Sequence, residues 1–197
     1  ITRFIFTITM FLLVSPIKGQ QEFSITYNFN NTNSPSVEYG NEAIIAEEAS
    51  FDGSKLQPTG FVNEENAIAW SGKIKNCNNQ VFSNAFVRLN IYPKKGYKIN
   101  IQTILTRQKG IEHLNNYFVI GCSLAGKEPN RDMKGQCSEE YKFTSQFKIK
   151  SFDPDKKFAT SNGIDYLSVW IGARANSPSQ FTWLLDDIVI KGTYEKD

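Results

Sequence analysis

Histidine is nearly absent from this sequence, because the 197 residues contain only His113. A metal centre built from several histidines is therefore excluded, and a Ser-His-Asp triad would have to use this one residue. His113 follows Glu112 at the start of an expected strand, which favours a surface position. The G-x-S-x-G, H-E-x-x-H, P-loop and dinucleotide-binding fingerprints are also missing. The sequence predicts that the protein is not an enzyme.

A two-carboxylate glycosidase is the enzyme class that these absences leave open. Such an enzyme needs only two acidic side chains at a suitable separation. The chain has 20 acidic residues, none of which stands in a recognisable catalytic context. Glycan hydrolysis therefore remains an alternative to a function in binding.

An excess of charge of one sign is missing as well. The chain has 22 basic and 20 acidic residues, and the first 19 residues hold Arg3 and Lys18 but no acid, so the remainder has 20 of each sign. A neutral, mixed surface lacks the basic footprint that a phosphate backbone requires. Nucleic acid is not expected as a partner.

Long apolar runs are confined to the start of the chain. Arg3 precedes an apolar stretch from Phe4 to Val14, and Ser15-Pro16 and the small Gly19 follow it. The stretch is shorter than the roughly 20 residues that span a bilayer and has the three-part plan of a secretory signal peptide. We expect a signal peptide over residues 1–19 and a single domain over 20–197, secreted or at the cell surface, without membrane insertion. An N-terminal element of the fold is the alternative.

Cysteine is scarce, with three residues at Cys77, Cys122 and Cys137. Their spacing matches no zinc or redox motif. Cys122 and Cys137 bracket a polar segment, SLAGKEPNRDMKGQ, that must connect two strand-like runs. We expect these two residues to form a disulfide, which would stabilise the fold by about 3 kcal/mol in the chain-entropy model. Three thiols are the alternative.

A hydrophobic period of two runs through nearly the whole chain. In YKFTSQFKIK, residues 141–150, apolar positions alternate with polar ones as in a half-buried strand. Similar runs occur at 23–29, 84–93, 97–107, 116–124, 165–174 and 181–192. The only helix candidate is NEAIIAEEASF, residues 41–51. The pattern predicts an all-β fold, an antiparallel β-sandwich such as a jelly roll.

Four short segments carry a resemblance to a known group of proteins: ITYNFNN, AIAWSG, NYFVIGCSLAG and WLLDDIVIKG, in this order. Together they resemble the secreted jelly-roll modules of Bacteroidota-like bacteria, which are similar to carbohydrate-binding modules and MAM-like domains. The resemblance implies a binding module whose partner is a glycan or a cell-surface polymer. A structural or adhesive surface domain without a small ligand is the alternative.

The resemblance also implies a structural calcium ion. In many such modules an aspartate on the last strand binds the ion together with an acidic or amide residue after the first strand's aromatic. The matching positions are Asp187, or its neighbour Asp186, and Asn30. Calcium prefers six to eight oxygen ligands, several of them charged, so an asparagine weakens such a site. The alternative is that one aspartate faces solvent and the other accepts hydrogen bonds from turn amides.

Aromatic residues are abundant, with 15 Phe, 8 Tyr and 3 Trp. Tyrosine and tryptophan combine an apolar ring with a polar tip, which suits stacking on sugar rings. Trp170 is out of phase with Val169 and Ile171, so it is the first candidate for an exposed platform. Arg174, further along the same side, would bond a hydroxyl or carboxylate, and Tyr97 and Tyr117 are weaker candidates. The alternative is that each packs inside the sandwich.

Overall fold

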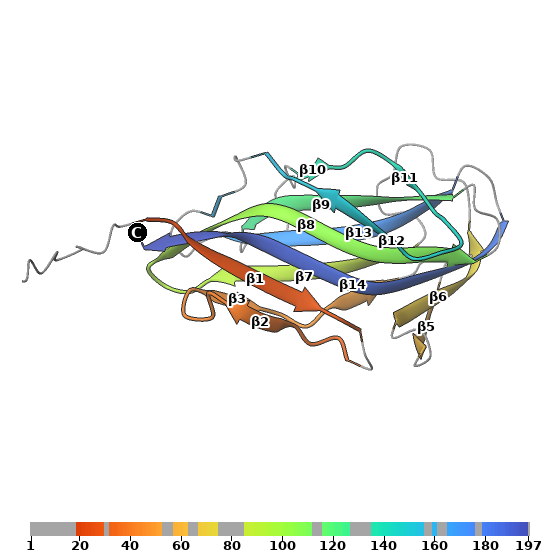
Figure 1. Cartoon of the computed structure of the whole chain (residues 1–197), viewed down its shortest axis with the longest axis horizontal. Coiled ribbons are helices and arrows are strands. Elements are labelled where there is room, and N and C mark those ends of the chain that lie inside the picture. The colour runs from red at the N-terminus through yellow and green to blue at the C-terminus, as the bar shows by residue number, and fades with distance from the viewer. Residues whose placement is uncertain are drawn as a thin grey trace, which may run out of the picture.

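Two antiparallel β-sheets packed face to face make up the fold (Figure 1). The computed structural model describes residues 19–29, 32–52, 57–62, 67–74, 85–111, 116–126, 135–155, 159–160, 165–175 and 179–196. Most of the expected signal peptide, Asn30, Cys77 and His113 lie outside these ranges. The described ranges contain no helix with the length and hydropathy of a membrane span.

The first sheet, sheet I, contains seven strands among the described residues, in the order β12-β8-β14-β1-β2 with β6 paired to β14 and β5 to β6. The strand bounds are β1 (Gln21–Tyr27), β2 (Ser36–Tyr39), β5 (Gln57–Val62), β6 (Ala67–Ile74), β8 (Tyr97–Ile111), β12 (Lys148–Phe152) and β14 (Ser179–Lys196). The long β14 pairs with β8 on one side and with β6 and then β1 on the other.

The second sheet, sheet II, also has seven described strands, in the order β10-β9-β13-β7-β3 with β11 paired to β9 and β4 to β7. The strand bounds are β3 (Ile44–Ala46), β4 (Ser50–Asp52), β7 (Ala85–Pro93), β9 (Asn116–Gly126), β10 (Gly135–Cys137), β11 (Tyr141–Lys142) and β13 (Asp165–Ala175). The predicted antiparallel β-sandwich is therefore confirmed.

The core lies between the sheets and follows the predicted alternation. Alternate residues in the middle of β7 and β13 are buried in it, including Leu89 and Ile91 from β7 and Leu167, Val169 and Ile171 from β13. Sheet I contributes Trp183, whose buried indole N–H donates a hydrogen bond to Gln108 Oε1 at 2.7 Å. This bond matters because an unpaired indole N–H would cost free energy in the interior.

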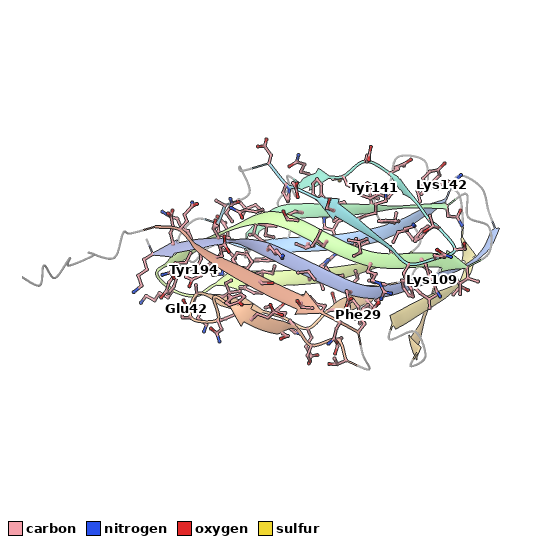
Figure 2. The ribbon with its side chains drawn as sticks, in the orientation of Figure 1. Phe29, Glu42, Lys109, Tyr141, Lys142 and Tyr194 are labelled. Carbon is pink, nitrogen blue, oxygen red and sulfur yellow. The ribbon has the colours of Figure 1, made fainter. Side chains whose placement is uncertain are left out.

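A hydrogen bond between the sheets closes one end of the sandwich. Tyr194, on β14 of sheet I, donates its hydroxyl proton to the carboxylate of Glu42, in the turn that leads into β3 of sheet II (Figure 2). Burial and this bond raise the pKa of Tyr194 to about 12. The bond also lowers the pKa of Glu42, so the acceptor stays ionised.

Two local predictions were wrong. The helix candidate at 41–51 contains β3 and β4 instead, because both segments pair with β7 and this pairing outweighs a weak helical preference. The predicted strand at 141–150 is divided: β11 pairs with β9 in sheet II, and β12 pairs with β8 in sheet I. The chain changes sheets between them, so Phe143 is buried whereas Ile149 is 67% exposed.

The predicted disulfide between Cys122 and Cys137 is also wrong, since both residues are thiols. In the register of β10 against β9, Cys122 lies opposite Gln136 and Cys137 lies opposite Gly121. A one-residue offset places two side chains on opposite faces of a sheet. Cys122 therefore points into the core, and Cys137 points away from it and is exposed.

The two thiols should differ sharply in reactivity. Burial raises the pKa of Cys122 to about 12, so little thiolate forms at neutral pH. We expect maleimide to modify Cys137 in the native protein within minutes, and Cys122 only after unfolding. Peptide mass spectrometry of labelled protein measures both, with denatured protein as the control. Equal protection of both residues would contradict the observed register.

The aspartate pair that interrupts the last strand forms a β-bulge. Leu185 lies opposite Gln108 and Ile188 opposite Thr106, so Asp186 and Asp187 together face the single residue Arg107. Asp186 is buried and forms an ion pair with the guanidinium of Arg107, whose side chain is 42% exposed. The guanidinium carbon also lies 4.5 Å from the centre of the Phe147 ring. The strict alternation expected through Asp186 and Asp187 is thus broken at this point.

Replacing Asp186 should destabilise the fold more than replacing its neighbour. Asp186→Ala removes a buried, charge-assisted interaction, so we expect the free energy of unfolding to fall by about 1–3 kcal/mol. Asp187→Ala is the matched control and should change it by less, because that carboxylate is only partly buried. Urea denaturation of both variants measures the difference. Equal losses would show that the ion pair with Arg107 is not what stabilises the bulge.

Candidate functional site

The outer surface of sheet II gathers polar and aromatic side chains from three neighbouring strands. On β13, Ser168 lies beside Asn90 of β7 and Ser123 of β9, and Trp170 lies beside Arg88 and Gly121. These residues alternate with the core residues of the same strands, so they face away from the other sheet, although Ser123, Ser168 and Trp170 are buried on that side. We call this surface the sheet II face; its members include Arg88, Asn90, Tyr92, Tyr117, Ser123, Tyr166, Ser168 and Trp170.

A stacked pair of tyrosines lies at one end of the sheet II face. The Tyr92 and Tyr166 rings are 4.8 Å apart between centroids with an interplanar angle of 25°. Both side chains are partly exposed, and the next residue outward, Ile45, pairs with Tyr92 in the register and is also exposed. Burial first, and then the charge of Glu47, raises the pKa of Tyr92, so its hydroxyl stays protonated at neutral pH. This end offers apolar rings with hydroxyl tips.

Next to the tyrosines lies an amide with an unused acceptor. Asn90 donates from Nδ2 to Glu47 Oε2 at 3.0 Å. Its Oδ1 atom is buried and has no hydrogen-bond partner in the described part of the protein. A buried acceptor without a partner costs about 1–3 kcal/mol, so a donor that reached it would be favoured. The amide and the tyrosine pair thus lie side by side at one end of the sheet II face.

Trp170 is on the expected face but is not the exposed platform that was predicted, because its exposed fraction is 4%. Its ring lies over Gly121: a Cβ atom at that glycine would come 2.0 Å from Trp170 Cζ2. Only glycine permits this approach, so one surface of the indole is covered by the neighbouring strand β9. Alternation correctly predicts the face, but it contains no information about the residue on the next strand.

The other predicted ligand residues fall on two different sheets. Tyr117 is partly exposed and pairs with Arg174 in the register, so both positions belong to the sheet II face. The side chain of Arg174 lies outside the described residues. Tyr97 is on sheet I, where its ring meets that of Tyr194 edge-on at 6.0 Å and packs against the core. The structure thus brings Trp170, Arg174 and Tyr117 to one face and separates Tyr97 from them.

Sequence reasoning missed Asn90, Tyr92 and Tyr166. The signal was present, because Asn90 and Tyr92 alternate with Leu89 and Ile91 in the same way that Trp170 alternates with Val169 and Ile171. What the sequence does not provide is the pairing of β7 with β13, which places Tyr92 against Tyr166.

The calcium ion implied by the resemblance stays a prediction. Arg107 already neutralises Asp186, and Asn30 lies outside the described ranges. Within those ranges, no group of three or more His, Cys, Asp or Glu side chains is arranged to hold a metal ion. Burial raises the pKa of Asp187 while Arg107 opposes the shift, so ionisation of this carboxyl works against the folded state as pH rises through that pKa. Asp187 is the carboxylate that a cation at the bulge would use.

Several solved structures align with this chain at low similarity. The CBM22-1 xylan-binding domain of Paenibacillus barcinonensis Xyn10C aligns with a TM-score of 0.42 and 11% identity over 87% of this chain and 94% of that domain. The family 11 carbohydrate-binding module of Clostridium thermocellum gives 0.37 and 9%, over 85% and 95%. A Stig cyclase of Fischerella sp. TAU gives 0.33 and 9%, over 87% and 98%. No protein-family model and no curated protein sequence matches the chain.

The contact between Trp170 and Gly121 can be tested with a double-mutant cycle. Trp170→Ala should lower the free energy of unfolding by about 3–5 kcal/mol, because a large buried side chain is lost. Gly121→Ala should also destabilise, since the new methyl group collides with the indole. In the Trp170→Ala background, Gly121→Ala should have little further effect. Denaturant unfolding of all four proteins gives the coupling, and additive losses would contradict the contact.

Proposed function

We propose that this protein is a secreted, non-catalytic module that binds carbohydrate on the sheet II face. The observation that supports this most directly is the stacked, partly exposed Tyr92 and Tyr166 pair beside Asn90, whose buried Oδ1 has no partner among the residues that the structure describes. A sugar ring has an apolar face that packs on aromatic rings and a rim of hydroxyls that donate and accept hydrogen bonds. The tyrosine pair suits the apolar face, and the amide suits the rim.

The partly exposed polar residues of β7 extend this surface along the strand. Arg88 lies one step further along β7 than Asn90, whereas Ser168 and Ser123, in register beside Asn90, are buried. Amide and guanidinium groups on one strand can contact neighbouring hydroxyls of a glycan chain. The expected signal peptide at residues 1–19 supports a location outside the cell, where such polymers occur.

Binding of a glycan at the sheet II face should be weak. Two tyrosine rings and a few polar groups bury little of a sugar, and only the surplus over the cost of association appears as affinity. We expect dissociation constants between micromolar and millimolar, or about −4 to −8 kcal/mol. A glycan array would identify the class of sugar, and calorimetry would give the constant.

The decisive variant is Tyr166→Ala. We expect the dissociation constant of the best array ligand to rise about tenfold or more, which corresponds to about 1.4 kcal/mol, because half of the ring pair is lost. Asn90→Ala should weaken binding in the same direction. Ile149→Ala is the control: it removes an exposed apolar side chain from β12 on the other sheet, and it should leave both affinity and melting temperature unchanged.

Three results would overturn parts of the proposal. Unchanged affinity in both Tyr166→Ala and Asn90→Ala would place the ligand elsewhere. Absence of binding to every arrayed glycan would favour the structural or adhesive alternative. Turnover of a polysaccharide by purified protein, abolished by changing a single carboxylate, would show a glycan hydrolase.

A further inference from the structure

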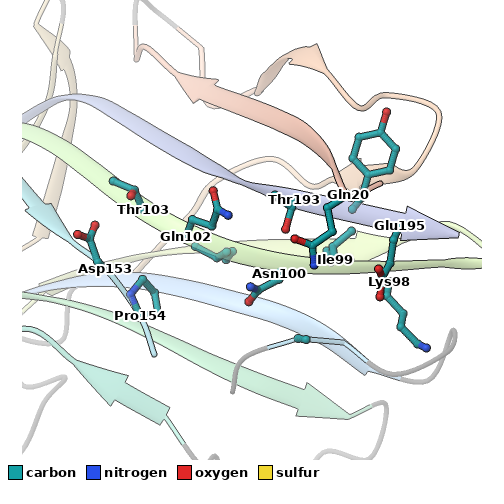
Figure 3. A pocket seen from close by; sticks show the side chains of 13 residues that line it. Gln20, Lys98, Ile99, Asn100, Gln102, Thr103, Asp153, Pro154, Thr193 and Glu195 are labelled. Atoms are coloured by element: carbon teal, nitrogen blue, oxygen red, sulfur yellow. The ribbon is translucent and has the colours of Figure 1, made fainter. Parts of the chain in front are cut away.

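The outer face of sheet I carries two adjoining hollows, each of about 580 Å³. The first lies over the start of β8 and the end of β14, beside the segment that follows β12 (Figure 3). The second lies over β1 and β2. Gln102 and Thr103 line both, so the hollows meet at these two residues. We call the pair of hollows the sheet I groove.

A second β-bulge creates the meeting point. Ile101 pairs with Gly192 and Thr103 pairs with Lys191, so Gln102 is an extra residue on β8. Ile101 and Ile104 are both buried in the core, which leaves Gln102 and Thr103 together on the outer side. Gly192, opposite Ile101, leaves room on the core side for the Phe23 ring, because a Cβ atom there would come 2.6 Å from Phe23 Cζ. The groove is therefore built into the strand pairing and does not depend on a loop.

The groove is lined by polar groups that the fold does not use. Ser24 and Thr193 are nearly buried on its floor, and within the described part of the chain neither they nor Gln102 and Thr103 make a side-chain hydrogen bond. Asn100 Oδ1, on the wall of the first hollow, is buried without a partner among the described residues. Hydroxyl and amide groups in this state favour a ligand that both donates and accepts hydrogen bonds.

The charges select against an anionic ligand. Lys98 and Lys191 line the groove together with four carboxylates, those of Glu22, Glu38, Asp153 and Glu195. An acidic excess repels a polyanion. Tyr39, which lines the second hollow and is 65% exposed, supplies an aromatic ring at the far end.

We infer that the sheet I groove is a second binding site, and that it takes a neutral oligosaccharide. The path from β8 across β14 and β1 to β2 covers three strand spacings, or about 14 Å, which suits a chain of several sugars more than a single ring. The ligand class rests on the proposed function, whereas the location does not, because the two faces lie on opposite sides of the sandwich and share no residue.

A titration that resolves each site separately tests the inference. We would add cello-, xylo-, laminari- and mannohexaose to nitrogen-15-labelled protein and follow the backbone and side-chain amide signals. We expect at least one hexasaccharide to shift the amide signals of Gln102, Thr103 and Lys191. The shifts should saturate with added sugar and so give a dissociation constant. These shifts should persist in Tyr166→Ala. In the double variant Gln102→Ala/Tyr39→Ala, the dissociation constant obtained from the groove signals should rise at least tenfold, while the shifts of Tyr166 and Ser168 stay unchanged.

The variants also separate the possible outcomes. Shifts confined to the sheet II face would overturn the second site and leave the proposed function standing. Shifts confined to the groove would support the second site and contradict the placement of the ligand on the sheet II face. Tighter binding of an acidic hexagalacturonate in the groove, or no shift there with any hexasaccharide, would overturn the inference. An unchanged melting temperature confirms that the double variant, whose two side chains are exposed, is folded.

Discussion

The register of β13 against β7 and β9 determines what each side of sheet II presents. Because successive side chains of a strand alternate between faces, one pairing sends Leu167, Val169 and Ile171 into the core and sends Tyr166, Ser168 and Trp170 outward. A slip of one residue would exchange the two sets and expose the core residues, so burial of the apolar set fixes the polar set as well. The chemistry of the sheet II face is thus held in place by packing on the opposite side.

Much of this arrangement could be predicted from the sequence, because alternation is a local property. It correctly indicates the sandwich, the strands β1, β7, β8, β9, β13 and β14, and the outward position of Trp170. It does not indicate that Gly121 lies beneath the indole, that Tyr92 meets Tyr166, or that Cys122 and Cys137 are offset by one residue. These facts depend on which strands pair and in which register.

The remaining mismatches arise where a strand departs from regular geometry. Alternation continues through residues 141–150 in the sequence, but the chain leaves sheet II and enters sheet I within that segment. At Asp186 and Asp187 the pattern contains an extra residue, and at Gln102 it contains another. The first bulge places carboxylates opposite Arg107, and the second opens a groove. In both cases the added residue places two consecutive polar side chains on the same side of the strand. A regular strand would have placed them on opposite faces.

The pairing of β1 with β14 also determines how the sandwich responds to mechanical load. Gln21 pairs with Tyr194, and the two strands run antiparallel from that point. A pulling force applied at these two residues acts on one pair of hydrogen bonds at a time, starting from Gln21, and does not shear all seven pairs together. Under a force in this direction, β1 separates from β14 one residue pair at a time, and the detached β1 would carry Phe23 and Ile25 out of the core.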